Sequence, residues 1–399
     1  MSVASGLEVF LRRPPASMRG QRVGLICNPA SVDRQLRHAA DLLWESPQIR
    51  LSALFGPQHG ARGETQDNMI EWESYRDPET SLPVFSLYGE TRKPTPEMLD
   101  QVDALIFDVQ DVGARYYTFI YTMALAMQAC AENGKRFVVL DRPNPVGGQA
   151  VEGNLVRPEC RSFVGLYSLP ARHGMTVGEL ARLFNREYAL GCRLEVVEME
   201  GYQRSMSWGQ TGLPWVMPSP NMPTPDTAWV YPGLCLLEGS NVSEGRGTTR
   251  PFEISGAPWV NPKQLASRLQ GFELPGAALR PLWFIPTFHK WAGKMVGGVQ
   301  IHVQDWRAFR PFRTGLALLR AYRELAPDEF AWKEPPYEYE YEKLPIDILL
   351  GDADLRRMIE QGRPLEEMEA SFAQPLEQFK RIRHKYLLYP DQPSPGESR

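Results

Sequence analysis

The sequence predicts an α/β protein, with a Rossmann-like parallel sheet in an N-terminal domain (residues 1–152) and an α+β C-terminal domain (residues 153–399). The first observation is that short apolar runs alternate with amphipathic segments over roughly the first 150 residues, the pattern of a parallel sheet with helices on both faces. The second is that this rhythm changes after about Glu152. The third is the length, because 399 residues with 43% hydrophobic side chains can form more than one core.

Five apolar runs predict the strands of the parallel sheet, namely 23–28, 49–55, 84–88, 103–109 and 136–140. The helices expected among them are 33–45, one that begins at Pro96 with Thr95 as its N-cap, and 116–133. In each predicted helix the apolar residues recur at helical spacing. The alternation therefore predicts that every strand ends at the same edge of one sheet.

The second half mixes helices with strands. Thr176 and Glu179 form a capping box for a helix that ends near Tyr188. The strands expected after it are 279–285 and 295–303, and the helices are 314–325, 352–361 and 364–383. The acidic, tyrosine-rich run 337–342 predicts a surface turn or strand. Nine prolines between Pro214 and Pro262 predict rigid loops whose aromatic side chains either form an irregular packed layer or line a cleft, namely Trp208, Trp215, Trp229, Tyr231 and Trp259.

Charge and cysteine content narrow the class of protein. The net charge is −4 and the basic residues form no stripe, which argues against a nucleic-acid partner. The longest apolar stretch, 119–131, is interrupted by Thr122 and Gln128 and is too short for a membrane span, and the N-terminus lacks the apolar core of a signal peptide. Five well-separated cysteines without a CxxC pair indicate reduced thiols, so we expect a cytoplasmic protein.

Several common cofactor and metal motifs are absent. No GxGxxG follows the first strand, so no dinucleotide cofactor is expected despite the sheet pattern. The sequence contains no GxxxxGK[ST], HExxH or GxSxG motif, and its six histidines are scattered singly. We therefore expect neither a cofactor nor a metal, and the sequence predicts no particular oligomeric state.

Polar residues follow the predicted strands, where ligands bind in open α/β sheets. Glu90 lies after the third strand, between Gly89 and the cations Arg92 and Lys93, which can hold an anion or tune the carboxyl group. His59 lies in a glycine-bounded loop after the second strand, where a role in the site competes with hydrogen bonding within the turn. The other candidates at these strand ends are Gln58, Asp108, Asp111, Asp141, Arg142 and Asn144.

Carboxylates in loops add to this set. Glu64 and Glu244 are further candidates, and Asp108 and Asp111 precede Arg115 closely enough to form a local salt-bridge network instead. Paired carboxyl groups at a cleft suit glycoside hydrolysis, because one protonates the leaving oxygen while another stabilises or attacks the anomeric centre or activates water. The same residues suit other acid–base chemistry, so composition does not decide between them.

Seven segments together point to a family. The chain resembles the DUF1343 family of NamZ-type exo-β-N-acetylmuramidases in GLICNPASVDR, LFGPQHGARGE, LYGETRKPT, FDVQDVGARYYTF, LDRPNPVGG, MPSPNMPTPDTAWVYPG and LEGSNVSEGRGTTRPFE, over a range from about Gly6 to Tyr389. The resemblance implies an exo-acting glycosidase that releases non-reducing terminal N-acetylmuramic acid from peptidoglycan fragments at a cleft between two domains. It implies that the catalytic glutamate of the family corresponds to Glu90. Some relatives carry a secretion signal, and its absence here favours recycling of imported fragments.

The resemblance and the strand ends together give a set of expected roles. We expect Glu90 to act as the general acid, with His59 and Asp108 in the same pocket. The residues expected to bind the small amino-sugar substrate are Gln58, Arg92, Lys93, Asp111, Arg115, Asp141, Arg142, Asn144, Asn221, Asn241, Glu244 and Arg246. A lactyl carboxylate distinguishes N-acetylmuramic acid from N-acetylglucosamine and calls for an arginine. Of Arg92, Arg115, Arg142 and Arg246 we favour Arg246, because the flanking glycines allow a close approach to a ligand.

Two other classes of protein stay open. A sugar-binding module without catalysis would contain the same aromatic loops. A metal-assisted hydrolase of another substrate could use His59, Asp108 and Asp141.

Overall fold

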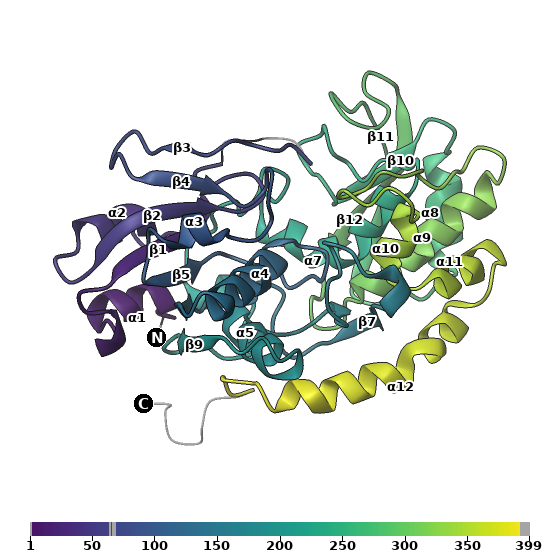
Figure 1. Ribbon diagram of the computed structural model, residues 1–399. Helices are drawn as coiled ribbons and strands as arrows, with labels where there is room; N and C mark the ends of the chain where they lie inside the picture. The colour runs from purple at the N-terminus through teal and green to yellow at the C-terminus, as the bar shows by residue number, and fades with distance from the viewer. Residues whose placement is uncertain (1, 64, 66–68, 392–399) are drawn as a thin grey trace.

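The structure, a computed structural model, describes residues 2–63, 65 and 69–391 of the chain (Figure 1). Within these residues the largest sheet has seven strands in the order β3-β4-β2-β1-β5-β6-β9. Neighbouring strands from β4 to β9 run parallel, and β3 is antiparallel to β4. The strands are β1 (Arg22–Cys27), β2 (Arg50–Gly56), β3 (Tyr75–Arg76), β4 (Pro83–Ser86), β5 (Ala104–Asp108), β6 (Arg136–Leu140) and β9 (Arg193–Val197). The α/β class and the five predicted strands of this sheet are therefore confirmed.

Helices cover both faces of the sheet, as the alternation of apolar residues predicts. Along β1, Val23, Leu25 and Cys27 belong to one core cluster and Ile26 to the other. The first cluster is completed by α1 (Gly6–Arg12) and α2 (Ala39–Glu45), and the second by α4 (Phe119–Glu132) and α5 (Val177–Glu187). The short α3 (Pro96–Leu99) begins with Thr95 as its N-cap, as predicted.

The helix predicted over 33–45 is wrong in its first half. Helix α2 begins at Ala39, where the His38 side chain caps the backbone N–H of Ala40. Before it, the Asp33 carboxylate accepts hydrogen bonds from the backbone N–H groups of Gln35 and Arg37 at 2.9 Å, so a local turn competes with the helix. Leu36, which the spacing places on the buried face, has a φ of 65° and is exposed.

The C-terminal half surrounds a smaller antiparallel sheet of order β10-β12-β11, as expected for an α+β unit. Its strands are β10 (Ile254–Ala257), β11 (Ala277–Phe284) and β12 (Val296–Val303), and a separate pair is formed by β7 (Glu152–Leu155) and β8 (Pro170–Arg172). The helices are α6 (Trp208–Thr211), α7 (Pro225–Leu234), α8 (Pro262–Gln270), α9 (Pro311–Leu325), α10 (Pro345–Leu350), α11 (Ala353–Glu360) and α12 (Leu365–His384). Helices α7 and α9 touch backbone to backbone, because a Cβ on Gly233 would lie 1.8 Å from the Pro311 carbonyl oxygen.

The parallel sheet extends beyond residue 152. Strand β9 is its edge strand, and α5 packs against β6 and β9, although both elements lie within 153–399. The chain also returns to this sheet at its end: α12 crosses beneath the molecule in Figure 1, and the Tyr389 hydroxyl donates to Asp141 at 2.6 Å. Residues 1–152 therefore do not contain the whole of the sheet unit.

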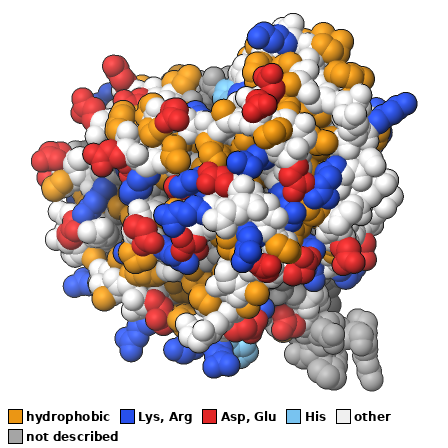
Figure 2. Space-filling model, turned by 90° about the vertical axis from the view of Figure 1, so that its right-hand side faces the viewer, with side chains coloured by type: hydrophobic (Ala, Val, Ile, Leu, Met, Phe, Trp, Pro, Cys, Tyr) orange, Lys and Arg blue, Asp and Glu red, His pale blue; other side chains and the backbone are white. Residues whose placement is uncertain are grey.

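The surface carries charges of both signs. On the face shown in Figure 2, acidic and basic side chains are interspersed, with hydrophobic side chains between them. Among the residues that the structure describes, no helix is long and apolar enough to cross a membrane.

Candidate active site

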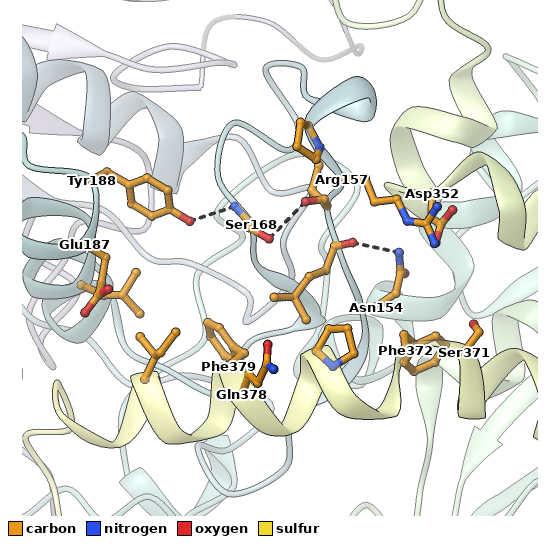
Figure 3. Close-up of a pocket in the computed structure, with 16 residues that line it drawn as sticks. Asn154, Arg157, Ser168, Glu187, Tyr188, Asp352, Ser371, Phe372, Gln378 and Phe379 are labelled. Carbon is orange, nitrogen blue, oxygen red and sulfur yellow. Dashed lines mark hydrogen bonds and ion pairs between the residues drawn. The ribbon is translucent and has the colours of Figure 1, made fainter.

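Two cavities are candidates for the functional site. The larger, of about 460 Å³, lies between β7, α5 and α12 and is mostly apolar. Figure 3 shows that some of its polar groups are engaged with one another: the backbone N–H of Ser168, for example, donates to the Tyr188 hydroxyl at 3.0 Å. Its carboxylates, Glu187 and Asp352, lie on opposite sides. This cavity therefore brings no pair of carboxyl groups together.

The smaller cavity, of about 40 Å³, has a different chemistry. It lies beyond the carboxyl ends of the parallel strands, where ligands bind in open α/β sheets. Gln58 and His59 enter it from the loop after β2, and Tyr117 and Thr118 from the segment before α4. Tyr116 also lines it, and the C-terminal half contributes the rest of the wall, namely Val164, Ser219, Asn221, Met222, Tyr231, Glu238, Arg246, Phe252, Tyr337 and Glu338. Both halves of the chain therefore build this cavity.

Glu338 is the carboxyl group held by the sheet side of the cavity. It is 4% exposed, and it accepts hydrogen bonds from the Tyr88 hydroxyl at 2.7 Å and the Gln58 amide at 3.4 Å. The Thr118 hydroxyl donates to the carbonyl oxygen of Gln58 at 2.7 Å, which turns the amide nitrogen towards Glu338. Burial raises the pKa of Glu338, and the nearby charge of Glu238 raises it further, against the hydrogen bond from Tyr88.

Glu238 is the second carboxyl group, and it is held by the C-terminal half. It follows α7 in the 3₁₀ helix Cys235–Gly239. Arg246 donates to one of its oxygens at 2.9 Å and the Tyr337 hydroxyl to the other at 2.7 Å. A guanidinium and a hydroxyl that donate to the two oxygens stabilise the ionised form. The cavity thus contains two buried carboxyl groups in different surroundings.

Glu244 lies behind this cavity and organises the cations around it. It has no exposed surface, and it faces Arg246 and His289 at 3.3 Å and Lys290 at 2.9 Å. Burial alone would raise the pKa of Glu244, but Lys290, His289 and Arg246 together hold it well below its usual range. Glu244 therefore stays ionised and fixes the Arg246 guanidinium beside Glu238.

The tyrosine-rich run at 337–342 is a turn, as predicted, and its end at Tyr341 and Glu342 is exposed, but its first two residues are buried at the cavity, which the prediction of a surface turn did not anticipate. The backbone groups of Tyr337 and Glu340 pair at 2.9 Å, and Tyr337 and Glu338 are both buried. The Arg92 guanidinium stacks between the rings of Tyr88 and Tyr339, 4.3 and 4.2 Å from their centroids. Arg92 therefore joins this turn to the end of β4 and does not face the cavity.

Four of the predicted site residues meet in the cavity, namely Gln58, His59, Asn221 and Arg246. His59 has a φ of 70°, and its Nδ1 lies 3.1 Å from the carbonyl oxygen of Thr65. Glu64, another candidate, lies outside the described residues. Of the aromatic residues expected as either packing layer or cleft wall, Tyr231 lines the cavity, whereas Trp208 and Trp229 pack on Trp215 and Trp306. The segment therefore forms a packed layer in part and a cavity wall in part, as the two expectations for it proposed.

The acidic candidates at the ends of β5 and β6 bind other protein groups instead. Both oxygens of Asp108 accept from Arg142, at 2.6 and 2.8 Å, and Asp108 has no exposed surface. Asp141, also fully buried, accepts from the hydroxyls of Thr176 and Tyr389 at 2.7 and 2.6 Å. Asp108, Asp141 and Arg142 do not line the cavity, so the prediction that Asp108 and His59 share a pocket is wrong.

Asp111 and Asn144, in the loops that follow β5 and β6, also bind other protein groups. Asp111 lies 3.3 Å from His173 and accepts from the backbone N–H of Gly113 at 2.6 Å. The Asn144 amide donates to the carbonyl oxygen of Met175 at 3.0 Å. These side chains position the loops after β5 and β6 and do not enter the cavity.

Four remaining candidates also lie apart from the cavity. Glu90 is exposed after β4, and Lys93 pairs with Glu132 at 2.6 Å. Arg115 has no exposed surface and donates to the carbonyl oxygens of Asn154, Leu169, Leu349 and Leu350, so it pairs neither with Asp111 nor with a substrate. Asn241 bonds the backbone of Glu329 and Ala331.

A metal site is not visible at the strand ends. In the part of the chain that the structure describes, no group of three or more His, Cys, Asp and Glu side chains is arranged to hold a metal ion. Two of the three ligands considered for a metal-assisted hydrolase, Asp108 and Asp141, are saturated by protein donors.

An α/β scaffold with two buried carboxyl groups at the carboxyl edge of its sheet is the arrangement of a carboxylate-dependent hydrolase. The family models described as exo-β-N-acetylmuramidase NamZ, N-terminal and C-terminal, match residues 23–226 and 229–389. The chain belongs to the NamZ family.

Known relatives match nearly the whole length of the chain. The chain is 47% identical over 387 residues to the peptidoglycan β-N-acetylmuramidase NamZ of Bacillus subtilis, covering 97% of this chain and 91% of that protein. Among solved structures, it is similar to two DUF1343 family proteins of Bacteroides fragilis. The first has a TM-score of 0.88 at 38% identity and covers 97% of this chain and 99% of its own, and the second has 0.77 at 29%, covering 98% and 100%.

Proposed function

We propose that this protein is an exo-acting glycoside hydrolase that releases non-reducing terminal N-acetylmuramic acid from peptidoglycan fragments. The observation that carries the proposal is the 47% identity over 97% of the chain to a peptidoglycan β-N-acetylmuramidase, with both NamZ family models matched. The cavity supports it physically, because glycoside hydrolysis uses two carboxyl groups, and Glu338 and Glu238 both line the cavity with different hydrogen-bond partners.

We further propose that the sugar binds at the mouth of the smaller cavity, which is lined by Gln58, His59, Asn221 and several tyrosines. Burial raises the pKa of Tyr117 and Tyr231, so both hydroxyls remain protonated and can donate to sugar oxygens. The family resemblance also puts forward Glu90 as a catalytic group. Its exposed position is compatible with a contact to the part of the substrate that extends beyond the cavity.

Two broader expectations also belong here. We propose a cytoplasmic enzyme that acts on imported fragments, a view supported by five cysteines that are all buried and free of disulfides. We place the boundary between the two domains near residue 227 and not at 152, since the family models meet there and β9 belongs to the first sheet.

The test is product analysis with the disaccharide of N-acetylmuramic acid β-linked to N-acetylglucosamine. We expect mass spectrometry to show both free sugars, and no cleavage of the matched disaccharide of two N-acetylglucosamine units. Activity that survives exhaustive chelation would exclude metal assistance. Binding of the disaccharide without cleavage would overturn the proposal in favour of a sugar-binding protein.

A further inference from the structure

We propose that Glu338, supplied by the turn Tyr337–Glu340 of the C-terminal half, is the general acid that protonates the glycosidic oxygen. The inference rests on the proposed function and names a residue that the sequence patterns leave out. It replaces Glu90 in that role.

Position is the first argument. Glu338 lines the cavity, and its two hydrogen-bond partners come from the other half of the chain, 250 and 280 residues away. The carboxyl group is therefore fixed across the junction of the two halves by Tyr88 and Gln58. A general acid has to be held within hydrogen-bond reach of the oxygen that it protonates, and this turn holds Glu338 at the cavity wall.

The two oxygens of Glu338 are not equivalent. Oε2 accepts a short hydrogen bond from Tyr88, 2.7 Å, whereas the contact between Oε1 and the Gln58 amide is 3.4 Å. Oε1 is therefore the less engaged oxygen. A proton carried on Oε1 would make an O–H donor at the wall of the cavity.

The two carboxyl groups of the cavity have different surroundings. Burial is the largest influence that raises the pKa of Glu338, and Glu238 adds to it. Glu238 instead has a cation beside it, because Arg246 donates to one of its oxygens and Tyr337 to the other. The titratable or charged groups around Glu338 are Tyr88, Arg92, Glu238, Lys333, Tyr337 and Tyr339, and His59 lines the same cavity.

The step balances as a hydrolysis. The Glu338 proton passes to the glycosidic oxygen as the bond from that oxygen to the anomeric carbon breaks, so the second sugar leaves as an alcohol. Water then bonds to the anomeric carbon and releases the proton that restores Glu338. The Glu238 carboxylate stabilises the positive charge at the anomeric carbon between these events.

The experiment compares Glu338→Gln with wild type on two substrates. On the natural disaccharide we expect kcat to fall by about 10²–10⁴-fold. On an aryl muramide whose phenol leaves without protonation, we expect a much smaller loss. The basic limb of the pH profile should disappear in this variant. The control is Glu342→Gln, an exposed carboxylate four residues along the same run, which should behave as wild type.

Tyr88→Phe keeps the inference testable if Glu338→Gln does not fold. Its hydroxyl stabilises the ionised form of Glu338, so removing it should raise the pKa of that carboxyl and move the basic limb to higher pH. An unmoved limb, or equal losses on both substrates in Glu338→Gln, would overturn the inference. Wild-type protein that leaves the disaccharide intact would instead overturn the proposed function.

Discussion

Two buried clusters in this molecule each join a carboxylate to an arginine, and they differ in what the carboxylate faces. At the end of β5, both oxygens of Asp108 accept from Arg142, and the aspartate has no exposed surface. At the cavity, Glu238 divides its oxygens between Arg246 and Tyr337 and still lines the opening. Asp108 and Glu238 are both buried and both paired with an arginine. What distinguishes them is that Glu238 lines a cavity and can contact a ligand, whereas Asp108 contacts only protein groups and stabilises the fold.

The comparison is tested most strongly by Glu238→Gln, which keeps the shape of the side chain and removes its charge. We expect kcat on the disaccharide to fall by about 10²–10³-fold, because the positive charge at the anomeric carbon loses its stabilising carboxylate. The fold should tolerate the change, since Arg246 keeps Glu244 as a partner at 3.3 Å. A variant with an unchanged melting temperature and more than about a tenth of wild-type kcat would contradict this role.

Asp108→Asn should act on stability instead. Removing one partner of a buried ion pair leaves Arg142 uncompensated, and we expect the free energy of unfolding in urea to fall by about 3–5 kcal/mol. The matched control is Asp103→Asn, which breaks a half-exposed pair with Arg22 and should cost about 0–1 kcal/mol. A stable Asp108→Asn protein that has lost kcat would place Asp108 in the reaction after all.

The sequence patterns predicted local structure well. The strands of the parallel sheet, the capping boxes and the main helices follow from apolar spacing and capping residues within a few positions, so they can be derived from neighbours in the chain. The turn at Asp33 was missed because its carboxylate competes with helical hydrogen bonds, and apolar spacing does not register that competition.

The candidate site was predicted less completely, for a related reason. Strand ends identified Gln58 and His59, and the motif loops identified Asn221 and Arg246. Glu338 was missed because its partners lie 250 and 280 residues away, so its burial is invisible in a run of acidic and tyrosine residues. Glu238 was missed although it lies six residues before Glu244 in a motif already singled out.

Arg246→Lys distinguishes two roles of Arg246 at the cavity, namely pairing with Glu238 and Glu244, and binding the lactyl carboxylate of the substrate. Lysine keeps the positive charge but loses the planar fork that donates to Glu238 and faces Glu244. Because both glutamates already engage this guanidinium, we expect muramide and glucosaminide substrates to lose kcat/KM equally, by about ten- to hundredfold. The measurement is the ratio of the two kcat/KM values. A ratio that falls selectively for the muramide would restore the prediction that Arg246 binds the lactyl carboxylate.

Glu90→Gln is the smallest expected change and the sharpest test of the comparison, since the family resemblance assigns the general acid to Glu90 and the proposal above assigns it to Glu338. Glu90 is exposed after β4 and lies apart from the cavity, whereas Glu338 and Glu238 line it. Substitution of an exposed side chain shifts a free energy by about 0.5 kcal/mol, so we expect kcat/KM on the disaccharide to stay within about threefold of wild type.

If Glu90 were the general acid, its substitution would instead lower kcat by about 10²–10⁴-fold and remove the basic limb of the pH profile. Measuring Glu90→Gln and Glu338→Gln side by side on the disaccharide and the aryl muramide therefore assigns the role directly. If Glu90→Gln loses activity on the disaccharide alone while Glu338→Gln keeps it, the general acid is the exposed Glu90. The catalytic carboxyl of this fold is then a solvent-accessible group and not one enclosed in the cavity.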